Sequence, residues 1–224
     1  MKFELRDSFH QFFNRHGLIE FEDTLSSEDL DQLATKLQLQ LVHALEGKPL
    51  EISSNVELWK AGRDLWGQDP MIQKILTKSQ IGAIASFLFK KRPLRLAYTQ
   101  TLLNQASDMP FTQSFTLDDI SSMTPILGGA LLCFYSPSTH EDEGLLPDLT
   151  KQKTGRIIFF SASKPIDFPA LFAQKGLHCL LLCFAPAKVR YKLQPLDVNT
   201  HILKKSGYVF GDHIKEKEAP YLYH

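Results

Sequence analysis

The feature that most constrains the fold of this chain is a change of hydrophobic periodicity near Arg92. Before Arg92, apolar side chains recur every three to four residues, which is the spacing of amphipathic helices. After it, apolar residues form short runs of strand composition separated by glycine and proline. A helical first part followed by several consecutive strands predicts an α+β protein: an antiparallel sandwich or barrel with helices packed on one face.

Capping signals mark the beginnings of the predicted helices. Ser26, with Asp29 three residues later, is a variant of the capping box. Asp69 followed by Pro70 predicts a second helix, and we expect Ser79 to cap a third. We assign the apolar faces of these helices to one side of a core rather than to a cofactor. The apolar face of the helix that Ser26 caps is formed by Leu30, Leu33, Leu37, Leu41 and Leu45.

The strand-forming part begins with residues 93–115, which we interpret as strand, turn and strand. In the second run, residues 111–117, period-2 alternation places Thr112, Ser114 and Thr116 on one face, toward either solvent or a pocket. Further strands are expected at residues 17–21, 126–135, 156–161, 177–184 and 189–193. Because no linker or repeat is evident, we predict one domain over residues 1–224, with a mostly helical part at 1–92 and a strand-rich core and tail at 93–224.

Composition excludes several classes of protein. The net charge is zero and the pI is near 7.1, so we expect no broad nucleic-acid surface. No apolar run approaches the ~18 residues that span a bilayer, and Glu4, Arg6 and Asp7 interrupt what would be the core of a secretory signal. The three cysteines form no Cys-x-x-Cys pair. We therefore expect buried, reduced thiols in a cytoplasmic protein with no membrane association.

Six short segments carry a resemblance to a known family. They are similar to phytanoyl-CoA-dioxygenase-like proteins, which open with an aromatic residue, a Gly-Leu step, a strand and a Leu-Ser-x-Glu-Glu-Leu helix. The segments are residues 13–19 (FNRHGLI), 25–30 (LSSEDL), 68–72 (QDPMI), 79–82 (SQIG), 95–103 (RLAYTQTLL) and 207–212 (GYVFGD). This resemblance implies a double-stranded β-helix (jelly roll) of the Fe(II)/2-oxoglutarate oxygenase type, in which two histidines and one carboxylate hold the iron and an arginine or lysine grips the co-substrate.

The sequence departs from that family at the metal site. The His-x-Asp pair aligns with Thr112 and Ser114, and neutral hydroxyls are poor Fe(II) ligands. Residues 161–165 contain no distal histidine, and His178 stands near the position of the co-substrate arginine. We therefore expect no metal, no cofactor and no catalytic residue, but a vestigial pocket. The residues expected to border it are Tyr98, Thr112, Ser114, Lys164 and His178.

This interpretation favours a non-catalytic protein that binds a small molecule or a protein partner. An alternative is an active Fe(II)/2-oxoglutarate dioxygenase with other ligands, of which His140 and Asp142 are the candidates. Random placement of eight histidines and 25 acidic residues in 224 positions gives roughly 0.9 such His-x-acid pairs, so one pair carries little information. A second alternative is a divalent-metal-responsive DNA-binding regulator, which zero net charge and the lack of a helix-turn-helix signature disfavour.

Overall fold

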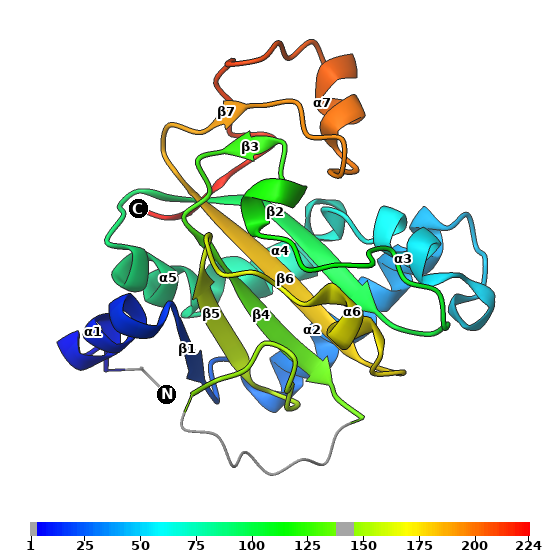
Figure 1. Cartoon of the computed structure of the whole chain (residues 1–224), viewed down its shortest axis with the longest axis horizontal. Coiled ribbons are helices and arrows are strands. Elements are labelled where there is room, and N and C mark those ends of the chain that lie inside the picture. The colour runs from blue at the N-terminus through cyan, green and yellow to red at the C-terminus, as the bar shows by residue number, and fades with distance from the viewer. Residues whose placement is uncertain (1–3, 138–145) are drawn as a thin grey trace.

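The computed structural model describes residues 4–137 and 146–224 (Figure 1). Its first ninety residues are helical apart from one strand, as the apolar spacing predicts. These elements are α1 (Asp7–His16), β1 (Leu18–Phe21), α2 (Ser27–Ala44), η1 (Leu50–Ile52), α3 (Asn55–Ala61), η2 (Leu65–Gln68), α4 (Pro70–Lys78) and α5 (Ile81–Phe89). None of the helices in the described part of the chain is long and apolar enough to cross a membrane.

Two of the three predicted caps are confirmed. The Ser26 hydroxyl accepts a hydrogen bond from the Asp29 amide at the start of α2, and Asp69 caps α4 in front of Pro70. The prediction for Ser79 is wrong, because α5 begins after Gln80, which makes no side-chain cap. Ser79 instead donates its hydroxyl to the Leu76 carbonyl and so closes the end of α4. Side chains of this type bond to whichever backbone group their local geometry offers.

The rest of the chain builds an antiparallel sheet in the order β1-β5-β4-β6-β2-β8. A smaller sheet of two strands, β3 and β7, lies at one end of it, beside α7 (Figure 1). The elements after residue 93 are β2 (Leu94–Leu103), η3 (Leu117–Ile120), β3 (Met123–Thr124), β4 (Gly128–Tyr135), β5 (Ile157–Ser161), α6 (Phe168–Phe172), β6 (His178–Pro186), β7 (Arg190–Tyr191), α7 (Thr200–Lys205) and β8 (Tyr221–Tyr223).

One predicted strand is absent. Residues 111–116 form bends and a single bridge, Phe115 to Ile166, and η3 follows directly. The capping box between Thr116 and Asp119 starts that 3-10 turn, so local hydrogen bonding overrides the alternating pattern. Within the described residues, the second side of the predicted jelly roll is therefore reduced to this bridge and the two-stranded sheet. The large antiparallel sheet and its buttressing helices agree with the predicted fold class.

Both faces of the large sheet are buried. Alternate residues of β6 show this directly: Leu180, Leu182 and Phe184 pack with the helices, in what we call the helix-side core. Cys179, Leu181 and Cys183 point to the opposite face, the inner core, which η3 and α6 cover. Strands buried on both faces consist of near-continuous apolar runs, which is the composition of β4, β5 and β6.

The three cysteines are free and buried, as predicted. All three belong to the inner core. Cys133 and Cys179 are direct partners across β4 and β6, a contact between distant segments that the sequence did not indicate. Burial raises the pKa of the Cys183 thiol, so this sulfur is a packing group rather than a nucleophile.

Candidate functional site

A cavity of about 450 Å³ opens beside α3. It is lined by α3, by residues 110–111 and by a segment that precedes and enters α7, residues 195–198 with His201. We call it the Trp59 pocket. Its volume lies in the range of about 300–1,000 Å³ that is typical of small-molecule sites.

Aromatic rings that pack against each other form one wall of the Trp59 pocket. The Trp59 ring meets Phe111 edge-on at 4.9 Å between centroids and Phe168 at 5.5 Å. Trp59 is 4% exposed and Phe111 8% exposed. Because both rings also belong to the inner core, this wall of the pocket is rigid. Such preformed apolar walls with a few polar groups are typical of ligand sites.

A buried ion pair lies behind the pocket. Arg63 Nη2 donates to Asp197 Oδ1 at 2.9 Å, and both side chains are almost fully buried. Asp197 also accepts the backbone amides of Ser122 and Asn199. Burial alone would lower the pKa of the Arg63 guanidinium, but the Asp197 carboxylate reverses this and raises it. The guanidinium therefore keeps its charge, and the Arg63–Asp197 contact joins the residues before η2 to the segment that carries α7.

The same cluster contains a second aromatic contact and a second carboxylate. The Arg63 guanidinium lies over the Tyr98 ring at 3.9 Å, within the range of a cation–π interaction. Asp64 accepts the Thr99 amide at 2.8 Å and a hydrogen bond from the Asn199 side chain. Asp64 is partly exposed as a residue, and desolvation of its carboxylate raises its pKa to about 6. These contacts join β2 to the segment that carries α7.

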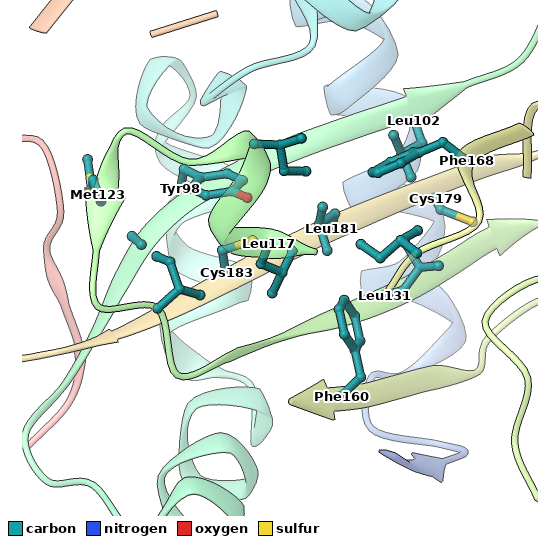
Figure 2. Packing of buried hydrophobic residues seen from close by; sticks show 14 of the residues in the cluster. Tyr98, Leu102, Leu117, Met123, Leu131, Phe160, Phe168, Cys179, Leu181 and Cys183 are labelled. Atoms are coloured by element: carbon teal, nitrogen blue, oxygen red, sulfur yellow. The ribbon is translucent and has the colours of Figure 1, made fainter. Parts of the chain in front are cut away.

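The inner core beside this cluster is filled. Figure 2 shows the side chains of Leu117, Leu131, Phe160, Phe168 and Leu181 meeting over the face of the sheet that carries Tyr98. All five are at most 2% exposed. The polar side chains on this face of β2 include Tyr98 and Gln100, and Gln100 donates to the Trp59 carbonyl. This region is a packed apolar core.

The structure places the five residues of the predicted pocket in different parts of the fold. Thr112 and Ser114 are exposed in the bends before η3. Lys164 lines a separate surface cavity of about 420 Å³ at the end of α1. Tyr98 faces the inner core, whereas His178 faces the helices. The cause is register: Leu103 of β2 pairs with His178, and both lie on the face opposite to Tyr98.

His178 is a buried structural histidine. Its Nδ1 lies 3.4 Å from Gln38 Nε2 of α2, and its ring packs against Phe134 at 4.8 Å. Burial lowers its pKa to about 4. An unprotonated imidazole in an apolar setting cannot replace an arginine that binds a carboxylate. His140 and Asp142, the alternative metal ligands, lie outside the described residues.

We expect His178 to contribute a rise in stability with pH between about 4 and 6.5, opposed by the raised pKa of Asp64, which the folded protein keeps protonated to higher pH. In this window the unfolded chain binds a proton at His178 that the folded protein excludes, so the free energy of unfolding increases with pH by up to about 1.4 kcal/mol per unit. Urea denaturation of the wild type and of His178→Phe across this range measures the effect. The pH dependence should flatten in His178→Phe but not in the exposed control His201→Gln. An equal slope in all three proteins would contradict the assignment.

A larger cavity, of about 890 Å³, lies between the start of α2 and α4. Its lining is mostly hydroxyl, amide and charged groups, with Asp23, Glu28 and Asp29 opposite Lys74 and Lys78. Acidic and basic side chains both line it, and few apolar side chains could exclude water from a ligand. The Trp59 pocket therefore fits a small molecule better, although it is smaller.

Sequence reasoning missed the residues of this site. Arg63 and Asp197 are 134 positions apart, and neither belongs to a motif. The one available signal was Trp59 at helical spacing from Val56, which is also the spacing of an ordinary core residue.

No protein-family profile and no curated protein matches this chain. Several solved structures are similar to it. SnoK, a non-haem α-ketoglutarate-dependent carbocyclase from nogalamycin biosynthesis, has a TM-score of 0.68 at 11% identity over 96% of each chain. SnoN, an epimerase of the same dependence and biosynthesis, has a TM-score of 0.67 at 14% identity over 97% of this chain and 98% of its own. CT296 from Chlamydia trachomatis has a TM-score of 0.50 at 19% identity over 84% of this chain and 99% of its own.

These likenesses define the class of fold: the chain has the fold of the non-haem α-ketoglutarate-dependent enzymes. At these identities they show the fold alone. The narrower phytanoyl-CoA-dioxygenase-like branch that the sequence resembles stays a prediction. Fe(II) in this class needs a facial set of two histidines and a carboxylate. Within residues 4–137 and 146–224, no group of three His, Cys, Asp or Glu side chains could hold a metal ion, so the described residues do not fit that metal.

Proposed function

We propose that this protein is a non-catalytic, small-molecule-binding relative of the Fe(II)/2-oxoglutarate oxygenases. The proposal rests on how the inner face of the large sheet is packed. Among the described residues, buried apolar side chains pack closely over that face. The residues at the expected ligand positions, Thr112 and Ser114, are exposed in a bend. The Trp59 pocket, at the edge of this core, has the aromatic wall that suits a small-molecule ligand.

Loss of one ligand could reflect an alignment error, but several features agree. Thr112 and Ser114 offer neither imidazole nitrogen nor charge, and residues 161–165 contain no histidine. His178 is unprotonated near neutral pH and faces α2. A weak metal site and a missing co-substrate clamp would reduce both binding steps together.

We expect the purified protein to show no 2-oxoglutarate-dependent O₂ uptake and no micromolar Fe(II) affinity. The measurements are oxygen-electrode assays and anaerobic calorimetry with Fe(II), in the presence and absence of 2-oxoglutarate. Thr112→His/Ser114→Asp is expected to fold like the wild type, because both side chains are exposed, and to gain no micromolar site, because a third ligand is missing.

Two outcomes would overturn the proposal. One is 2-oxoglutarate turnover by the wild type. The other is micromolar Fe(II) affinity that disappears in Thr112→Ala or in His140→Ala, which would establish an active dioxygenase with other ligands.

A further inference from the structure

We propose that the Trp59 pocket binds a small apolar carboxylic acid. This inference rests on the proposed function and names the class of ligand. It rests on two features of the pocket: its apolar walls, and two basic side chains at its edge that have no ion pair with another described residue.

The walls select an apolar body. Trp59 and Phe111 form one side, and Val198 and Leu196 come from the segment before α7. Leu196 is 39% exposed and gains burial from any occupant of the pocket. Each CH₂ group that a ligand buries strengthens binding, and this gain does not depend on the ligand's charge.

The pocket has no carboxylate available to a cation. Its acidic residue, Asp197, already accepts from Arg63 Nη2 and from the amides of Ser122 and Asn199. Arg63 balances its charge inside the protein. An amine that entered the pocket would therefore displace an existing hydrogen bond, and we expect the pocket to reject it.

Two basic side chains remain. Lys60 of α3 and His201 of α7 both line the pocket, and both are exposed. Neither has an ion pair or a side-chain hydrogen bond to another described residue. Lys60 supplies ammonium donors and His201 an imidazole N–H, so together they can receive one carboxylate at the mouth. A bound acid thus places its apolar body against Trp59 and its charge at the solvent edge.

Three probes with the same body test this arrangement: phenylpropionate, phenylpropanol and phenylpropylamine. Binding is followed by the fluorescence of Trp59 in a Trp66→Phe background, which leaves Trp59 as the single tryptophan, and by calorimetry. We expect saturable binding of the acid, roughly tenfold weaker binding of the alcohol and still weaker binding of the amine, because a charge-assisted hydrogen bond is stronger than a neutral one even where solvent screens it.

Variants locate the carboxylate. Lys60→Gln/His201→Gln should weaken the acid about five- to tenfold and leave the alcohol unchanged, since both residues are exposed and their loss does not disturb the core. Lys188→Gln, an exposed lysine outside the pocket, is the matched control. The proposal is overturned if none of the probes binds, if the three bind equally, or if the double variant binds the acid as the wild type does. Equal binding of all three probes would remove the acid specificity and leave the small-molecule function standing.

Discussion

Asp197→Ala is expected to lower the free energy of unfolding by about 3–5 kcal/mol, because it leaves the buried Arg63 guanidinium without its counter-ion. Among the described residues, Arg63 Nε and Nη1 have no hydrogen-bond partner. The ion pair of Arg63, through Nη2, is with Asp197. The backbone amides of Ser122 and Asn199 lose their acceptor in the same variant. Urea denaturation followed by circular dichroism measures the change.

The control is Asp118→Ala, which removes a surface pair with Lys192 at 3.6 Å. An exposed pair of this kind contributes about 0–1 kcal/mol. The variant Arg63→Met/Asp197→Leu separates the cost of an unpaired charge from the worth of the pair, because replacing both members of a buried pair by apolar groups is often neutral. Equal stability of Asp197→Ala and Asp118→Ala would show that the Arg63 cluster is not a buried ionic site.

Phe160→Ala is expected to destabilise the protein by a similar amount, about 3–5 kcal/mol, through a cavity in the inner core. Phe160 is fully buried and lies opposite Gly129 on β4. A Cβ added at Gly129 would come within 2.8 Å of Phe160 Cζ, so the ring lies across the glycine backbone. Since Gly129 has no side chain to move into the space, the cavity cannot collapse easily.

The control for the second substitution is Phe210→Ala, at a ring that is 77% exposed. It should change the free energy of unfolding by no more than about 0.5 kcal/mol. The same urea denaturation serves for both variants. A loss below about 1 kcal/mol in Phe160→Ala would indicate that the inner core is loosely packed, and would remove the main support for a fold without an iron cavity.

Local sequence determined most of the secondary structure. The strand at 93–103, the later strands, and the caps at Ser26 and Asp69 depend on side chains within a few positions of each other. The error at residues 111–117 has a local cause as well. Alternating Phe, Gln and Thr side chains satisfy a strand pattern, but the Thr116–Asp119 capping box offers the same backbone a competing turn.

The site depended on distant contacts. Alternation in β6 separates Cys179, Leu181 and Cys183 from their neighbours, but both sets are apolar, so the sequence cannot tell which set faces the helices. The family resemblance placed His178 and Tyr98 in one predicted pocket, whereas the register with β2 puts them on opposite faces.

The sequence by itself determined that the chain forms helices followed by antiparallel strands, because local periodicity and capping specify both. The alignment of Thr112 and Ser114 with metal ligands stays a prediction. Only the tertiary structure decided where a ligand could bind. The Trp59 pocket and the Arg63–Asp197 pair join α3 and η2 to a segment more than 130 residues away. Neither has a local pattern, because nonlocal packing brings these side chains together and burial then sets their charge and hydrogen bonding.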